Sequence, residues 1–546
     1  MFKFIRLVIV FLIVTDFTSF AQQRNGYQSH SVLEYTLKEI SGQNSSIISL
    51  KEIGKSAGGR SILAVEIGTG ERSEKPALLV VAGAEPDDIA GTYAATEFIR
   101  SLTADSLKSL LARVTIYAIP RLSPDGAEGY FSIPKISLPG NSEADDADHD
   151  GANDEDGAED LNADGQITMM RIIDPLGDWM LNPEDSALMK RADKRKGELG
   201  MYQLLTEGKD NDRDGKVNED EIGGTNVNRN FTFKYKPYQT DGGNYPFSSP
   251  EARSLGEFLF AHNNILAVFT FEYYDNINES WKISTPEQQS GNNFAPDSVA
   301  YSQTAALLKK HLQYSYKAEP PAGDIAQWAY FHGGRLSFCA PAWMYPSIQT
   351  DTTKESPKKT SDYKKNSVDN EIRALRWIQN FAPQNFIQWK KYDHPDFTGM
   401  SVEIGGFAPF ALHNPPADSL VSVVKGSVNL LTELAQLMPE LIVESKKIEP
   451  LGNDIFRVTI SITNIGKLPS HTVVGRQVRG LRPLQSRVEL APGQKILSGK
   501  AIQLFTEPLA PQATIQHTFL VLGKGDIHYT IGCPTTGFVK TKMSIK

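Results

Sequence analysis

Short apolar runs alternate with longer amphipathic segments over residues 32–438. This alternation is typical of helices that flank a mixed, mostly parallel sheet, so we predict an α/β fold for this part of the chain. The predicted strands are 77–81, 114–119, 265–271 and 401–404. The predicted helices are 88–102, 250–262 and 418–437, and Ser249 is expected to cap the second of them through its hydroxyl.

After Pro439 the pattern becomes one of strict alternation. Phe456, Val458, Ile460 and Ile462 are separated by polar residues, which is the period of a strand with one buried face. Residues 514–522 and 527–533 are similar and lie between Gly and Pro turns, so we predict a β-sandwich. The predicted domains are a signal peptide at 1–21, an α/β domain at 22–438 with an insertion at about 140–222, and the sandwich at 439–546.

The acidic charge is concentrated in one segment. The chain of 546 residues has a formal net charge of -9, and the stretch from Glu143 to Asp164 alone contains eleven acids and no Lys or Arg. A local ion site explains this distribution better than a generally acidic surface does. Nothing in the charge pattern indicates nucleic-acid binding.

The first residues have the features of a secretory signal peptide. Lys3 and Arg6 precede an apolar run at 7–14, and Ala21 is a small residue at the expected cleavage point. A membrane anchor is the alternative, but the run is shorter than the roughly 20 residues that a span needs. We therefore predict export without a membrane span. Cys339 and Cys533 are predicted to be two buried free thiols.

Three acidic repeats follow the calcium-loop pattern D-x-[DN]-x-D-G. Their candidate ligands are Asp146, Asp148 and Asp150 in the first repeat, Asp160, Asn162 and Asp164 in the second, and Asp210, Asp212, Asp214 and Glu221 in the third. Calcium takes six to eight hard oxygens, and alternate acids with a glycine turn can wrap them around one ion. Only the third repeat has an acid at its twelfth position. We expect calcium to order the insertion and not to drive a sensor-like opening.

The segment that follows the third repeat resembles the G-V-D-x-N-R-N-F segment of the zinc carboxypeptidases. It reads Gly-Thr-Asn-Val-Asn-Arg-Asn-Phe at 224–231. In that family the Asn-Arg pair grips the terminal carboxylate of a peptide, which implies this role for Asn228 and Arg229. A guanidinium suits the task because its planar fork donates two parallel hydrogen bonds. A structural ion pair is the alternative role for Arg229.

Further pieces of the chain are similar to the same family in the same order. They are 123–126, 328–330 and 336–338, and the acidic insertion with 394–406 is similar to an exported bacterial subgroup. The resemblance covers 32–438. It implies a carboxypeptidase fold in which two His and one Glu hold zinc, while another Glu takes a proton from the attacking water.

The residues that correspond to this machinery have been replaced. Glu85 and Asp88 stand in the turn that holds the first His and the Glu of the family, and Glu272 stands at the second His. Pro341 stands at the catalytic Glu, and a proline cannot accept a proton. Three carboxylates without imidazole suit calcium, magnesium or manganese better than zinc.

Three hypotheses follow. The first is a non-catalytic exported homologue that retains recognition of peptide or protein C-termini through Asn228 and Arg229. The second is an active metallocarboxypeptidase with an atypical metal at Glu85, Asp88 and Glu272. The third is a calcium-stabilised surface scaffold whose sandwich makes the contacts.

Overall fold

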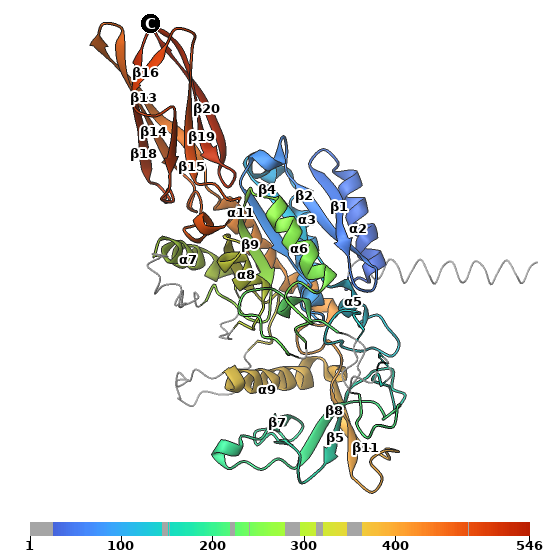
Figure 1. The fold of residues 1–546 in the computed structure, drawn as a ribbon. Coiled ribbons are helices and arrows are strands. Elements are labelled where there is room, and N and C mark those ends of the chain that lie inside the picture. The colour runs from blue at the N-terminus through green and yellow to red at the C-terminus, as the bar shows by residue number, and fades with distance from the viewer. Residues whose placement is uncertain are drawn as a thin grey trace, which may run out of the picture.

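The computed structural model describes residues 26–144, 151, 153–154, 156–218, 224–239, 241–278, 295–312, 320–346, 363–478 and 480–546. Three parts follow one another along the long axis of the molecule (Figure 1). The carboxyl-terminal sandwich lies at one end, the main α/β part in the middle, and a second sheet with helix α9 at the other end. Of the described helices, none has the length and apolar character that crossing a membrane requires.

The main sheet has six strands in the order β1-β2-β4-β3-β9-β10. Strands β3, β4, β9 and β10 run parallel, whereas β1 pairs antiparallel with β2 and β2 with β4. The mixed, mostly parallel sheet that we predicted is therefore confirmed. Its strands are β1 (Ile48–Lys55), β2 (Ser61–Ile67), β3 (Ala77–Val81), β4 (Thr115–Ile119), β9 (Ile265–Phe271) and β10 (Leu336–Ala340).

Helices cover both faces of this sheet because the central strands are apolar on both sides. Leu78 and Val80 of β3 join one core, and Leu79 and Val81 join the other. The helices of the first core are α2 (His30–Gln43), α3 (Ile89–Ser101), α4 (Lys108–Arg113), α7 (Ala295–Leu308), α10 (Leu420–Val423) and α11 (Lys425–Gln436). Those of the second are α6 (Pro250–Ala261) and α8 (Ile325–Phe331), and α5 (Pro124–Glu128) follows β4.

Of two predicted helices, one has its predicted cap and the other is interrupted in the structure. The hydroxyl of Ser249 accepts the N–H of Ala252 at 3.3 Å, so the predicted cap of α6 is confirmed. The predicted helix at 418–437 is interrupted, because α10 ends at Val423 and α11 starts at Lys425. Gly426, a residue with weak helix propensity, follows two positions after the interruption, in the first turn of α11.

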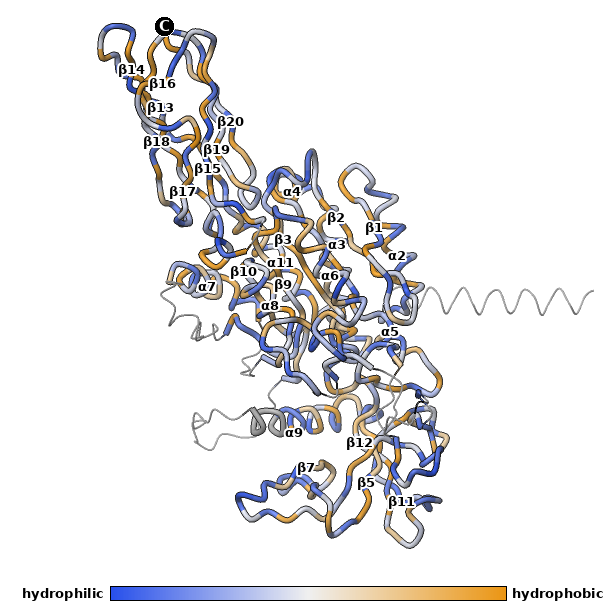
Figure 2. The backbone as a smooth tube through the Cα atoms, viewed as in Figure 1, coloured by the Kyte–Doolittle hydropathy of each residue, from blue (hydrophilic) through white to orange (hydrophobic). Residues whose placement is uncertain are grey.

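The second sheet is built from segments that are far apart in the sequence. Its order is β11-β12-β5-β8-β6-β7, and the strand predicted at 401–404 belongs here and not to the main sheet. Figure 2 shows that the strands of the main sheet are largely hydrophobic, whereas the loops around β7 and β11 are largely hydrophilic. The strands are β5 (Met169–Ile173), β6 (Trp179–Leu181), β7 (Met189–Arg191), β8 (Tyr202–Thr206), β11 (Phe386–Tyr392) and β12 (Val402–Phe407), with α9 (Tyr363–Phe381) beside them.

The predicted β-sandwich is also confirmed. Two four-stranded sheets, β13-β14-β18-β16 and β17-β15-β19-β20, enclose one core that includes Val458, Ile460 and Tyr529. Cys339 and Cys533 are both free and buried, as expected. The strands are β13 (Leu441–Gly452), β14 (Ile455–Asn464), β15 (Leu484–Leu490), β16 (Lys495–Ser498), β17 (Ile502–Phe505), β18 (Thr514–Leu522), β19 (Gly525–Cys533) and β20 (Gly537–Ile545).

Candidate functional site

The candidate site lies where three parallel strands of the main sheet end. Glu85 follows β3 in the turn before α3, Glu272 follows β9 directly, and Pro341 follows β10. Because β9 lies between β3 and β10, these ends meet at one edge of the sheet. The N–H of Glu272 donates to the carbonyl of Ala340 at 3.4 Å, which places Glu272 next to Pro341. The carboxyl ends of the strands are the usual place for a site in such a sheet.

Glu85 is buried and fully engaged by hydrogen-bond donors. Its Oε1 accepts from Nδ2 of Asn228 at 2.8 Å and from a guanidinium nitrogen of Arg229 at 2.9 Å. Its Oε2 accepts from Nδ2 of Asn226 at 3.0 Å. Burial alone would raise the pKa of Glu85, but the charge of Arg229 and the amide donors outweigh it and hold that pKa below its usual range. Glu85 is therefore an anion that the chain itself neutralises.

The amide of Asn228 joins Glu85 and Glu272, the two carboxylates that the sequence analysis aligned with the family's histidines. Besides its bond to Glu85, Nδ2 of Asn228 donates to Oε2 of Glu272 at 3.2 Å. Its Oδ1 accepts the N–H of Ile325 at 2.9 Å, and this bond orients the amide. The side chain is completely buried. Asn228 thus connects the ends of β3 and β9 to the start of α8.

Glu272 lies in an environment that favours its neutral form. The hydroxyl of Thr270 donates to its Oε1 at 2.6 Å. Burial is the largest influence and raises the pKa of Glu272 well above its usual range, and the charge of Asp324 adds to the effect. Burial also raises the pKa of Asp324, which accepts from the hydroxyl of Tyr274 at 2.6 Å.

Asp88 serves as the amino-terminal cap of α3. Its Oδ1 accepts the N–H of Gly91 at 2.8 Å. Burial raises the pKa of Asp88 to about 7, the N–H of Gly91 opposes this rise, and the charges of Asp87 and Glu85 reinforce it. A helix cap satisfies backbone donors that have no partner within the helix. The position therefore has a structural task in this chain.

The residues at this site do not fit the zinc ion that the resemblance implies. Zinc needs lone pairs directed at one point, preferably from imidazole nitrogen or thiolate sulfur. Here N–H donors of Asn226, Asn228 and Arg229 point at Glu85 instead. Among the described residues, acids, histidines or cysteines close enough to share one ion occur at Asp210, Asp212 and Asp214, and not at Glu85, Asp88 and Glu272.

Arg229 is held at the same place. It ends a short helical turn (Val227–Arg229), and its guanidinium pairs with Glu85 at 2.9 Å and approaches Asp241 at 3.8 Å. The ion pair that we kept as an alternative is therefore present. The side chain of Arg229 is 18% exposed, whereas that of Glu85 is 3% exposed.

Two residues of this network had no assigned role in the sequence analysis. Asn226 belongs to the same Gly-Thr-Asn-Val-Asn-Arg segment, and its amide contacts Glu85. Asp324 caps α8 by accepting the N–H of Gln327 at 2.8 Å. The Asp-x-x-Gln spacing is a capping signal that indicates the start of α8. It does not indicate that the cap faces Tyr274 and Glu272.

Two of the acidic repeats can be followed in the described chain. Asp146, Asp148, Asp150 and Glu221 lie outside the described residues. Carboxylate oxygens of Asp210, Asp212 and Asp214 all lie within 4.8 Å of one another. Asp210 accepts the N–H of Gly215 at 3.1 Å, and Asp160 accepts that of Gly165 at 2.8 Å. Both glycines have positive φ, which lets each loop turn sharply.

Buried acids that the sequence analysis missed hold the two loops together. Asp156 accepts the N–H groups of Asn211, at 2.8 Å, and of Asn218, at 2.5 Å. Glu207 accepts the N–H groups of Leu161 and Thr168 at 2.8 and 3.0 Å. Both acids are completely buried. The second and third repeats are therefore one connected unit.

Comparison with solved structures finds similar chains, with carboxypeptidases among them. Carboxypeptidase A from Helicoverpa armigera has 15% sequence identity and a TM-score of 0.37, over 60% of this chain and 68% of that chain. Bovine thrombin-activatable fibrinolysis inhibitor, solved with a tick carboxypeptidase inhibitor, has 12% identity and a TM-score of 0.38, over 75% of this chain and 97% of that chain. A metallo-carboxypeptidase from Burkholderia cenocepacia has 14% identity and a TM-score of 0.28, over 55% and 57% of the two chains.

Comparison with family models covers most of the chain. Residues 440–544 match a domain of unknown function, and no curated protein matches the chain. The model described as zinc carboxypeptidase matches residues 33–159 and 192–375, which include Glu85, Asp88, Arg229, Glu272 and Pro341. These two ranges make up more than half of the 546 residues. The chain belongs to the zinc carboxypeptidase family.

Proposed function

We propose that this protein is a non-catalytic member of the zinc carboxypeptidase family. The observation that carries the proposal is the position of the Asn228 amide, whose Nδ2 donates to Glu85 at 2.8 Å and to Glu272 at 3.2 Å. An N–H donor carries partial positive charge and offers no lone pair. It therefore stands between two carboxylates where a shared cation would have to bind.

The missing base supports the same proposal. Pro341 has no group that can accept a proton from an attacking water. Glu403, which could be considered as a substitute base, pairs with Arg171 at 2.7 Å in the second sheet. The chain then lacks both the metal ligands and the base that peptide hydrolysis uses in this family.

Incubation with peptides in the presence of zinc, manganese or calcium tests this proposal against the atypical-metal enzyme. We expect no release of C-terminal residues with any of the three ions, as measured by mass spectrometry. Release that is lost in a Glu272→Gln variant would establish the active enzyme. Release that persists in Glu272→Gln would come from a contaminating peptidase. Further purification should then abolish the release of residues by the wild-type sample as well.

Recognition of peptide C-termini is a second candidate function. It is favoured by the partial exposure of Arg229, which keeps 18% of its side-chain surface while it pairs with Glu85. We expect calorimetry to detect peptides with a free carboxylate and not their amidated forms. Arg229→Lys keeps a positive charge beside Glu85 but loses the planar fork, so it should weaken binding about tenfold or more. Equal binding of free and amidated peptides would contradict this role.

We further propose that the protein is exported and that calcium orders the acidic loops. Export is supported by the amino-terminal sequence, which lies outside the described residues. Calcium is supported by the convergence of Asp210, Asp212 and Asp214 within 4.8 Å. Extracellular calcium is abundant enough to fill sites of modest affinity.

A further inference from the structure

Hydrogen bonds join the sandwich to the α/β part at residues 472–474, and we call this junction the seam. The hydroxyl of Thr472 donates to the carbonyl of Gly334 at 2.7 Å. The N–H groups of Val473 and Val474 donate to the carboxylate of Asp297 on α7 at 2.8 and 3.1 Å. Asp297 is completely buried. These contacts hold the loop before β15 against the end of α8, so the space beside it has defined walls.

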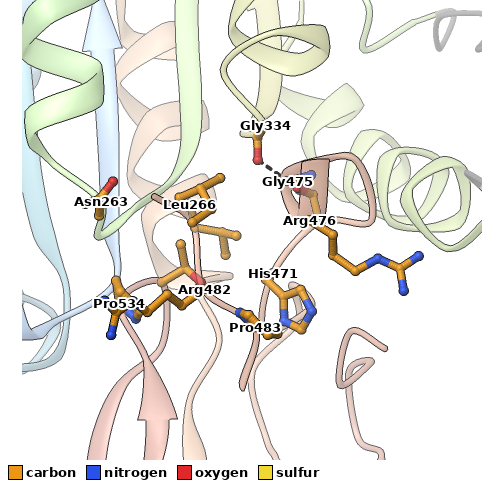
Figure 3. Close-up of a pocket in the computed structure, with 12 residues that line it drawn as sticks. Asn263, Leu266, Gly334, His471, Gly475, Arg476, Arg482, Pro483 and Pro534 are labelled. Atoms are coloured by element: carbon orange, nitrogen blue, oxygen red, sulfur yellow. Dashed lines mark hydrogen bonds between the residues drawn. The ribbon is translucent and has the colours of Figure 1, made fainter. Parts of the chain in front are cut away.

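A cavity of about 370 Å³ opens at this seam. Its volume is within the range of small-molecule sites. Figure 3 shows the adjoining part of the seam, where Arg482 and Pro534 of the sandwich lie near Asn263 and Leu266 of the α/β part. The residues that argue for a ligand are Asn263, Arg482, Pro483, Gln485, Pro534 and Phe538.

The charge of the cavity is positive. No Asp or Glu is among the described residues that line it or the adjoining pocket. The sequence from 455 to 488 also has no acid, although it contains six Lys and Arg in a chain with a net charge of -9. Arg457, Arg476 and Arg487 of this stretch pair with Glu449, Glu507 and Glu489, so the charge at the cavity itself comes from Arg482, and this positive charge favours an anionic ligand.

Arg482 is the basic group available to such a ligand. Arg476 pairs with Glu507 at 2.7 Å and, in Figure 3, extends away from Arg482. Both ring nitrogens of His471 are bonded, at 2.9 and 3.2 Å, and burial lowers its pKa, so it stays neutral. Within the described chain, the guanidinium of Arg482 has no ion pair or hydrogen bond.

The other walls supply hydroxyl-binding and ring-binding groups. The side-chain amides of Asn263 and Gln485 make no hydrogen bond to the described residues. Phe538 lines the cavity beside them and is 43% exposed. Amides can bind sugar hydroxyls, an aromatic face can pack against a sugar ring, and one arginine matches one carboxylate.

We propose that this seam cavity binds an acidic saccharide of one or two rings. Its carboxylate contacts Arg482, its hydroxyls contact Asn263 and Gln485, and its ring packs on Phe538. The site is separate from Glu85 and Arg229 and stands independently of the proposed loss of catalysis. It assigns a ligand-binding role to the junction of the two domains.

Titration of the full-length mature protein with digalacturonate, followed by NMR or calorimetry, tests the proposal. We expect binding to digalacturonate, and at least about tenfold weaker binding to neutral galactose disaccharides and in Arg482→Gln. Arg487→Gln is the matched control, because Arg487 is 60% exposed, belongs to the same basic stretch and lies outside the cavity lining. It should bind like the wild type.

Three results would overturn the proposal. The first is no digalacturonate binding at concentrations up to about 10 mM. The second is an equal loss of affinity in Arg482→Gln and Arg487→Gln, which would indicate a diffuse surface attraction. The third is binding of benzoate or of a peptide carboxylate as tight as that of the saccharide, which would refute the ligand class. Thermal melting of each variant verifies that the fold is retained.

Discussion

Replacing Arg229 by methionine is expected to lower the free energy of unfolding by about 3–5 kcal/mol, because it leaves a buried carboxylate without its partner. Glu85 is 3% exposed, and Arg229 supplies both a hydrogen bond at 2.9 Å and a positive charge that holds the pKa of Glu85 down. Urea unfolding at pH 7, followed by circular dichroism, measures the loss.

A double variant identifies the cause of this loss of stability. Glu85→Gln combined with Arg229→Met removes both charges and should recover most of the stability, since no unpaired ion then remains. Arg191→Met is the control, because Arg191 is 69% exposed and its pair with Asp178 spans 3.9 Å. A loss of unfolding free energy below about 1 kcal/mol in Arg229→Met would show that this ion pair contributes no more stability than a solvent-exposed pair does.

Removal of calcium with a chelator is expected to lower the melting temperature, and the effect should require the third repeat. If free calcium exceeds the dissociation constant a hundredfold, binding contributes about 2.7 kcal/mol of stability. Asp212→Asn should abolish the response because Asp210, Asp212 and Asp214 share one cluster. The measurement is a thermal melt with and without chelator, followed by addition of calcium or magnesium.

Asp178→Asn is the matched control for this experiment. Asp178 directly precedes β6 of the second sheet, whose strand β8 ends shortly before Asp210, and it is half exposed and pairs with Lys194. It should keep the full response to calcium. Because Asp156 and Glu207 tie the second repeat to the third, unfolding of both loops should be coupled. A melting temperature that is identical with and without chelator would refute the calcium role.

Local patterns predicted the main elements because each depends on residues that are close in sequence. The apolar run at 77–81 indicates a strand that is buried on both faces. The alternation at 455–464 indicates a strand that is buried on one face. The cap of α6 depends only on Ser249 and the following turn. The break at Val424 was missed because it falls inside a continuous amphipathic pattern, where helix periodicity alone predicts no interruption.

Pairing between distant segments could not be predicted in this way. The strand at 402–407 has the composition of many strands, yet it pairs with 169–172 and not with the main sheet. Asp156 and Glu207 are ordinary acids in an acidic stretch until the structure shows them completely buried against backbone donors of another loop. Such partners are selected by burial and geometry over large separations, which no local pattern contains.

At the candidate site, the sequence by itself predicted that Glu85, Asp88, Glu272 and Pro341 correspond to the zinc ligands and the base of the family. It also left Arg229 with two roles, a grip on a carboxylate or an ion pair. Only the tertiary structure decided that Arg229 pairs with Glu85 and that Asn228 joins Glu85 to Glu272. The physical reason is that residue identity limits which bonds a side chain can make, whereas the fold selects which partner is within reach.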